Sequence, residues 1–207
     1  MKLLCVILFL PIFVFPRENK FLKKFTDYNK KSYYAESVYK EHSWQTFYAL
    51  NDVHQTIQTD SIDLHLLNAC LFFATNKLRA MYKLPAFTMD IRLKNAASIH
   101  SYQMSMHHFF SHDNPYVDAI KTCNDRLKIC GIQPVRGSAE NCHKAIVDDN
   151  SLTYIELAQE IIESFFNSPG HKRNLMYPSF GYVACGAAYN YDEEDEMICF
   201  WVTQDFY

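Results

Sequence analysis

The chain has 207 residues, of which 49% are hydrophobic and 15% aromatic, and its formal net charge is −3 at pH 7. This apolar content is enough to form a core, so wholesale disorder is excluded. The slightly acidic balance argues against a dedicated nucleic-acid binder, and we expect no nucleic-acid partner. The length predicts one domain and an extension.

The first residues have the pattern of a targeting segment. Lys2 precedes an apolar run over residues 3–15, and Pro16 follows it. The run is shorter than the ~20 apolar residues of a membrane-spanning helix, so no transmembrane span is expected. It fits a secretory signal but lacks the usual small-residue cleavage pattern. Residues 1–16 are therefore predicted to be a signal peptide or an uncleaved hydrophobic anchor of a secreted, extracellular or periplasmic protein.

Residues 17–60 are polar, rich in aromatic residues and only weakly periodic. Their basic residues are better explained by a solvated helix face than by an anionic partner surface. We interpret this segment as an N-terminal extension or linker. Its candidate buried residues are Val38, Trp44, Phe47, Tyr48 and Leu50.

The helical pattern is sharper from residue 64 onward. Apolar residues at three- and four-residue spacing predict a helix over 64–81, and Asp90 is a candidate N-cap for a second helix. A short helix is expected over 124–129, followed by an irregular segment over 132–150. Thr153 and Glu156 form a capping-box pattern for a third long helix.

That third long helix is predicted to end at Pro169, because proline does not continue a helix. Beyond Gly181, alternating residues predict strands over 183–189 and 198–206. The acidic segment 192–196 would be the solvated tip of this terminal β-hairpin. Helices must cover the apolar face of such a sheet, which predicts a layered α+β domain.

Six cysteines follow the apolar N-terminal run. An even number after an export signal favours disulfides, and a cysteine metal site is disfavoured because there is no C-x-x-C pair. Cys185 and Cys199, on two neighbouring predicted strands, are the best candidates for a disulfide. The six are Cys70, Cys123, Cys130, Cys142, Cys185 and Cys199.

Three fragments place titratable side chains at the ends of predicted elements. Two of them end in His112 and in Glu140-Asn141, and the third contains Pro169-Gly170 directly before His171. The three side chains of His112, Glu140 and His171 could meet in one pocket. A single histidine would more simply bond a buried carbonyl, but three such residues favour a shared polar cavity.

From about residue 64 to 206 these fragments resemble, in order, the CAP superfamily of cysteine-rich secretory proteins, antigen 5 and pathogenesis-related 1 proteins. The likeness is to its short bacterial-type branch with an SCP domain. The matching pieces are residues 76–79 with 84–85, 90–97, 110–112, 126–131, 140–141, 165–174 and 201–206. The resemblance implies a CAP domain over 64–207, folded as a three-layer α-β-α sandwich.

The resemblance also implies a cavity lined by two histidines and two acidic residues. By motif, these are His112, His171 and Glu140, whereas the second acid has no counterpart and its place falls near Ser168. Asn141 and Gln204 are expected to be network partners around the cavity. Phe165 stands where the family usually has tryptophan.

Two imidazoles, a carboxylate and a water molecule would suit Zn²⁺, with His112 and His171 as the metal ligands. The chain has neither a G-x-S-x-G elbow nor an H-E-x-x-H pair, so two common hydrolase classes lose support. We therefore expect an extracellular binding module for a lipid, a peptide or a cell-envelope component. The alternatives are a metal-assisted hydrolase or peptidase with His112, Glu140 and His171 as candidate catalytic residues, and a purely structural domain.

Overall fold

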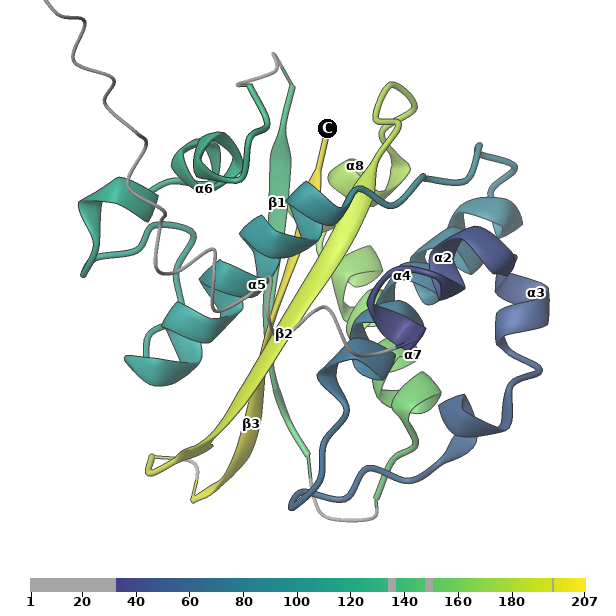
Figure 1. Cartoon of the computed structure of the whole chain (residues 1–207), viewed down its shortest axis with the longest axis horizontal. Coiled ribbons are helices and arrows are strands. Elements are labelled where there is room, and N and C mark those ends of the chain that lie inside the picture. Colours follow the sequence, from purple (N-terminus) through teal and green to yellow (C-terminus); the bar gives the residue numbers. More distant parts are fainter. Residues whose placement is uncertain (1–32, 134–136, 148–150, 195) are drawn as a thin grey trace, which may run out of the picture.

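The computed structural model describes residues 33–133, 137–147, 151–194 and 196–207. The predicted signal or anchor over residues 1–16 lies outside this part of the chain. Helices surround a small antiparallel sheet, so the α+β prediction is confirmed (Figure 1). In chain order the helices before the sheet are η1 (Tyr33–Ala35), α2 (Val38–Glu41), α3 (Trp44–Phe47), η2 (Asn51–His54), α4 (Leu64–Met81), α5 (Ile91–Met106), η3 (Asp118–Ile120) and α6 (Cys123–Ile129).

The sheet has three strands in the order β1-β3-β2. Strands β2 (Val183–Asp192) and β3 (Met197–Phe206) form the predicted terminal hairpin. Strand β1 (Ala139–Ile146) pairs antiparallel with the other edge of β3. The prediction of an irregular segment over 132–150 was therefore wrong for β1. Polar side chains point to both faces of this strand, so its sequence lacks the alternating apolar pattern that indicates a strand.

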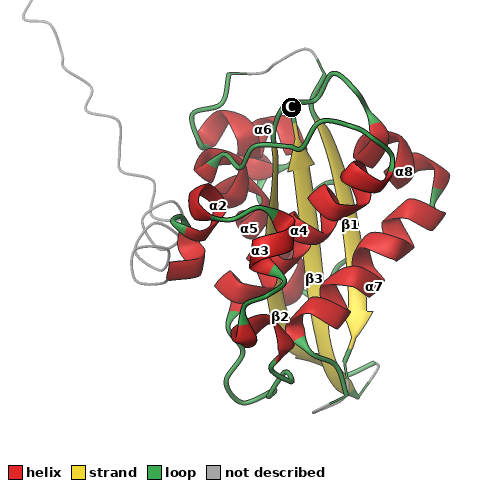
Figure 2. Cartoon of the chain, turned by 90° about the vertical axis from the view of Figure 1, so that its right-hand side faces the viewer, coloured by secondary structure: helices red, strands yellow, loops and turns green. Residues whose placement is uncertain are grey.

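Two helical layers cover the two faces of the sheet. Helices α4 and α7 (Tyr154–Asn167) lie on one face together with α2 and α3, and α5 and α6 lie on the other (Figures 1 and 2). The expected three-layer sandwich is thus present. Helix α5 approaches β2 so closely that a Cβ atom on Gly186 would lie 2.2 Å from the backbone nitrogen of Ser98.

The described part of the 17–60 segment packs against the main core. Val38, Phe47, Val53 and Ile57 are completely buried in the cluster formed with α4 and α7. Trp44, Tyr48 and Leu50 are partly buried against the same cluster. The division of the chain at residues 60–64 stays a prediction, but these contacts tie both sides of it to one core.

Side-chain caps fix the starts of the long helices, at Asp90 and Thr153 as predicted and at Asp63 without a prediction. Asp63 caps α4, Asp90 caps α5, and Thr153 with Glu156 forms a capping box at α7. The third helix ends at Asn167, and Pro169 begins a new helix, α8 (Pro169–Met176). Proline suits the first position of a helix because the backbone N–H that it lacks would have no partner there.

The expected disulfide between Cys185 and Cys199 is not formed. Cys185 lies opposite Gln204, and Cys199 lies opposite Asn190. Cys185 packs in the main core cluster, whereas Cys199 packs with Trp201 under the other helical layer. Because successive side chains of a strand point to opposite faces, the two sulfurs are separated by the sheet. No disulfide joins any of the six cysteines in the described residues.

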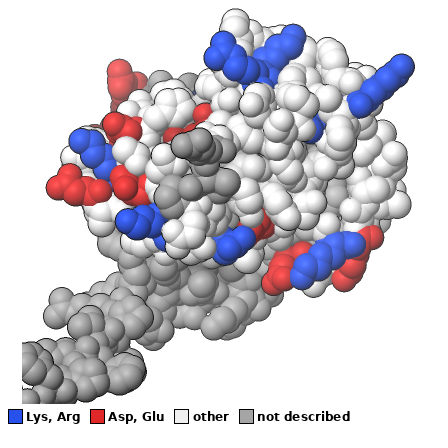
Figure 3. Space-filling model, turned by 90° about the horizontal axis from the view of Figure 1, so that it is seen from above, with Lys and Arg blue, Asp and Glu red and all other residues white. Residues whose placement is uncertain are grey.

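None of the described helices combines the length and apolar character needed to cross a membrane. Viewed from above, charged side chains of both signs border a broad uncharged area of the surface (Figure 3). On this face the described residues form no continuous basic patch.

Candidate functional site

The centre of the site is a contact between His112 and Glu140. His112 follows α5 in a loop, and Glu140 is the second residue of β1. The Nδ1 atom of His112 lies 2.8 Å from Oε1 of Glu140. The side chain of His112 is 60% exposed, while that of Glu140 is only 4% exposed. This hydrogen bond raises the pKa of His112 and fixes its ring at the surface.

Arg126 of α6 neutralises the buried carboxylate from the other side. Its Nη2 atom donates to Oε2 of Glu140 at 2.6 Å and to the backbone oxygen of His112 at 3.0 Å. Its Nη1 atom donates to the backbone oxygens of Ile120 and Lys121. Although burial acts in the opposite direction, His112 and Arg126 together lower the pKa of Glu140 to about 2. Glu140 is therefore ionised and has both oxygens engaged.

A second acid lies beneath Glu140. Asp205 of β3 stands opposite Glu140 in the strand register and is completely buried. Burial and the charge of Glu140 raise the pKa of Asp205 well above its usual range. Its Oδ2 atom has no hydrogen-bond partner among the described residues, and its Oδ1 atom accepts from the thiol of Cys123. The site thus has a second carboxyl group, whose raised pKa favours the protonated form, at a position that the motif comparison did not identify.

His100 closes the buried side of the cluster. It lies on α5, is completely buried, and bonds the backbone oxygen of Ser111 through Nε2 at 2.8 Å. Burial lowers the pKa of His100 to about 4, so the ring is neutral. Its bond to Ser111 holds the residue next to His112, which makes His100 a support of the loop.

His112 and His171 line one pocket, whereas Glu140 lies behind His112 and is not among the lining residues. The pocket has a volume of about 500 Å³ and is lined by His112, His171, Phe110, Ser111, Asp113 and Cys142. His171 is the third residue of α8 and its ring packs edge-on against Phe165, with the ring centroids 5.1 Å apart. Burial, reinforced by the neighbouring His112, lowers the pKa of His171 and favours its neutral form.

Cys142 lies at the inner wall of this pocket. Its Sγ atom is 3.7 Å from Nδ1 of His112, and only 5% of the residue is exposed. Burial raises the pKa of its thiol well above the usual value. Because the thiolate is the reactive form, Cys142 is placed as a wall of the pocket and lacks the activation of a nucleophile.

Asn141 and Gln204 lie behind the pocket on the opposite face of the sheet. Asn141 donates to the backbone oxygen of His171 and to Oε1 of Gln204, and accepts from Asn174 at 2.8 Å. Gln204 in turn donates to Thr75 of α4. These bonds attach α8, and with it His171, to the sheet. Ser168 lies between α7 and α8, half-buried, and is not part of the pocket lining.

Two groups of side chains have ligand atoms close enough together to hold a metal ion. The first group is His100, Glu140 and Cys142, and the second is Cys123, Glu140 and Asp205, with all ligand atoms of each group within 4.8 Å of one another. Both include Glu140, which already faces the positive charge of Arg126. His112 and His171, whose rings line the open pocket, are the other candidate ligands.

The pattern in the sequence did not reveal the groups that set the chemistry of Glu140. Arg126 and Asp205 entered the family resemblance only as parts of a helix and of the closing strand. His100 was recognised only as a residue on one face of the second long helix. The signal that could have indicated a buried ion pair is a charged residue on the buried stripe of a short helix, such as Arg126.

Comparisons with known proteins place this geometry in context. The model of the cysteine-rich secretory protein family, CAP, matches residues 72–206. The chain is similar to an extracellular protein containing an SCP domain from Bacillus anthracis, with 26% identity and a TM-score of 0.51. The similarity covers 68% of this chain and 39% of that protein, so this chain spans well under half of its length.

A second solved structure, an outer surface protein from Borrelia burgdorferi, is similar in fold. Identity is 16% and the TM-score is 0.52, over 73% of this chain and 98% of that one. The comparison with curated proteins gives no match.

Proposed function

Because the chain belongs to the cysteine-rich secretory protein family, CAP, we propose that it is a secreted binding module that holds an extracellular ligand between His112 and His171. The similar SCP-domain protein from Bacillus anthracis is extracellular, which supports the same location here. The ligand classes that fit the family and the pocket are a lipid, a peptide or a cell-envelope component.

The state of Glu140 is the observation that favours binding over hydrolysis. A general base must lie within hydrogen-bond reach of the proton that it removes. The two oxygens of Glu140 bond His112 and Arg126, and its side chain is 4% exposed. Glu140 therefore orients His112 and has no free oxygen directed at a substrate.

The two histidines present different forms to a ligand. The contact with Glu140 leaves Nε2 of His112 available to the pocket, and the raised pKa of His112 favours its protonated form. His171 has a lowered pKa and favours the neutral form. A ligand that carries a hydrogen-bond acceptor or a negative charge would bond His112.

The same pair is also our proposed pair of ligands for a metal ion. A metal-ligating histidine usually has its other ring nitrogen bonded to a carboxylate or carbonyl oxygen, as Nδ1 of His112 is bonded to Glu140. We propose that His112 and His171 would hold Zn²⁺. When bound, such an ion polarises oxygen ligands and lowers the pKa of a water molecule. A metal-assisted hydrolase is the second candidate on this ground.

Calorimetric titration of purified protein with Zn²⁺ tests the pair of histidines. Uptake by the wild type should be lost in His112→Ala and in His171→Ala. It should persist in His107→Ala, a matched control because His107 is exposed and stacks on Tyr116 outside the pocket. Equal uptake by all four proteins would refute the assignment of the ligands.

Screening against lipid vesicles, peptides and glycans tests the binding function. At least one class should bind the wild type more strongly than either pocket variant, without turnover. No binding in any panel would overturn the proposal, and turnover that a chelator abolishes would establish the hydrolase in its place.

A further inference from the structure

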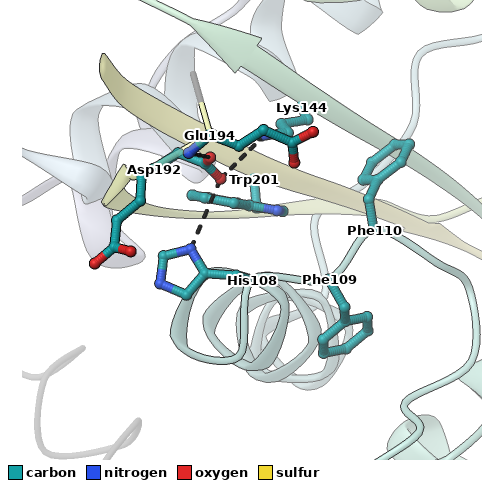
Figure 4. A pocket seen from close by; sticks show the side chains of 8 residues that line it. His108, Phe109, Phe110, Lys144, Asp192, Glu194 and Trp201 are labelled. Atoms are coloured by element: carbon teal, nitrogen blue, oxygen red, sulfur yellow. Dashed lines mark hydrogen bonds and ion pairs between the residues drawn. The ribbon is translucent and has the colours of Figure 1, made fainter. Parts of the chain in front are cut away.

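A second pocket lies beside the histidine pocket and has had no role so far. Its volume is about 560 Å³, and Phe110 lines both pockets. His108, Phe109 and Phe110 at the end of α5 form one side, and Lys144 of β1 and Trp201 of β3 form the sheet side. Figure 4 shows these side chains around the opening.

Trp201 presents an unused hydrogen-bond donor in this pocket. It is 1% exposed, and its Nε1 atom has no hydrogen-bond partner among the described residues. In Figure 4 this nitrogen lies on the side of the indole that faces Phe109 and Phe110. A buried N–H without a partner is unfavourable, so a carbonyl oxygen that reached it would be bound favourably. Phe110, on the side of the indole that carries this nitrogen, is 54% exposed.

The charges of the pocket are unbalanced. Asp192 is matched by Lys144, whose Nζ atom lies 3.1 Å away, and Nδ1 of His108 lies 3.7 Å from the same carboxylate. Glu193 and Glu194 follow on the hairpin, line the same pocket and are exposed. Within the described part of the chain, neither of their carboxylates takes part in an ion pair. The pocket therefore has two carboxylates left for a cationic ligand.

The backbone is strained at one wall of the pocket. His108 has φ of 49°, in the left-handed region that residues other than glycine seldom adopt. This conformation sets the ring of His108 edge-on to Trp201, with the ring centroids 6.1 Å apart, and close to Asp192. The same conformation ends α5, since the backbone N–H of Phe109 donates to the carbonyl oxygen of Met104.

We propose that this pocket binds a lysine or arginine side chain of an extended peptide. The alkyl stem of the side chain would lie against Phe109 and Phe110, and its charge would face Glu193 and Glu194. A backbone carbonyl of the peptide would accept the hydrogen bond from Nε1 of Trp201. The site is separate from His112 and His171, and its occupation requires no ligand there.

Nuclear magnetic resonance of the indole N–H groups tests this proposal directly. The chain has two tryptophans, and Trp201→Phe assigns the signal of Trp201. The probe is the blocked tripeptide acetyl-Ala-Lys-Ala-amide at millimolar concentration, with its arginine and norleucine analogues. The lysine and arginine peptides should shift the Trp201 signal downfield, and the norleucine peptide should not. No shift with the basic peptides, or an equal shift with norleucine, would overturn the proposal.

Charge variants separate the site from general electrostatic attraction. Affinity for the lysine peptide should fall about tenfold in the double variant Glu193→Gln/Glu194→Gln. The control Glu160→Gln/Glu163→Gln removes the same charge from exposed positions of α7 and should leave the affinity unchanged. Equal losses in both double variants would refute a defined site. If the diamine cadaverine bound as tightly as the peptide, the role of the indole N–H would be refuted.

Discussion

Replacing Arg126 by methionine tests whether the site depends on the buried ion pair. The guanidinium is completely buried and donates to Glu140 and to the backbone oxygens of His112, Ile120 and Lys121. In Arg126→Met the charge of Glu140 stays buried without its cation. Removing one partner of a buried pair typically costs about 3–5 kcal/mol. Since a domain is stable by about 5–15 kcal/mol, we expect a large loss of stability.

A double-mutant cycle with Glu140→Gln isolates the ion pair from the other contacts of Arg126. The double variant removes both charges, so its loss of stability should be smaller than the sum of the single losses by at least about 1 kcal/mol. Urea unfolding followed by circular dichroism at pH 7 measures each free energy. The pKa of His112, followed by proton resonance, should fall in Glu140→Gln because the hydrogen bond to Glu140 is what raises it.

A surface pair provides the control for this cycle. Arg92 and Asp90 are also 2.6 Å apart, but the side chain of Arg92 is 49% exposed. Arg92→Met should therefore lower the free energy of unfolding by no more than about 1 kcal/mol. If Arg126→Met lowered the free energy of unfolding as little as Arg92→Met, the buried pair would not hold the site together. The same would follow if the losses of stability in Arg126→Met and Glu140→Gln added up to the loss in the double variant.

Two further substitutions test the buried acid and the packing of the layers. Burial and the charge of Glu140 raise the pKa of Asp205, so the folded chain keeps a proton that the unfolded chain loses above pH ~4. Stability from this group therefore decreases as pH rises, and Asp205→Asn should be more stable relative to the wild type at pH 8 than at pH 5 in urea unfolding. An unchanged difference would show that Asp205 is ionised. Gly186→Ala places a Cβ atom 2.2 Å from the backbone nitrogen of Ser98, and should cost at least about 2 kcal/mol in the same assay. Wild-type stability would show that α5 can move away from β2.

The long helices and the hairpin could be predicted because their patterns are local. Asp63, Asp90 and Thr153 cap helices in the structure, and the first and third of these helices present an apolar stripe. Strands β2 and β3 each bury one face in the main core, which leaves a two-residue period in the sequence. In these elements local propensity and tertiary packing favour the same structure.

Strand β1 could not be predicted because neither of its faces is a simple apolar surface. Glu140, Cys142 and Lys144 face the layer of α5, and Asn141 and His143 face the layer of α7 and α8. Each polar group finds its partner on another element, so no local pattern remains. The same cause hid the second acid, since Asp205 is matched with Glu140 only through strand pairing.

The motif of the family singled out His112, Glu140 and His171 as candidates, but their electrostatics depend on residues outside it. A buried carboxylate can act as a base only if an oxygen is free and the charge is not already matched. Arg126 supplies that match from α6, and His112 takes the other oxygen. In this chain Glu140 is therefore a positioning residue whose effect is to hold one imidazole toward the pocket. A second carboxyl group is present in Asp205, but it is completely buried and its pKa is raised. The pocket consequently offers two imidazoles and no free carboxylate from this pair, an arrangement that supports the proposed binding function over hydrolysis.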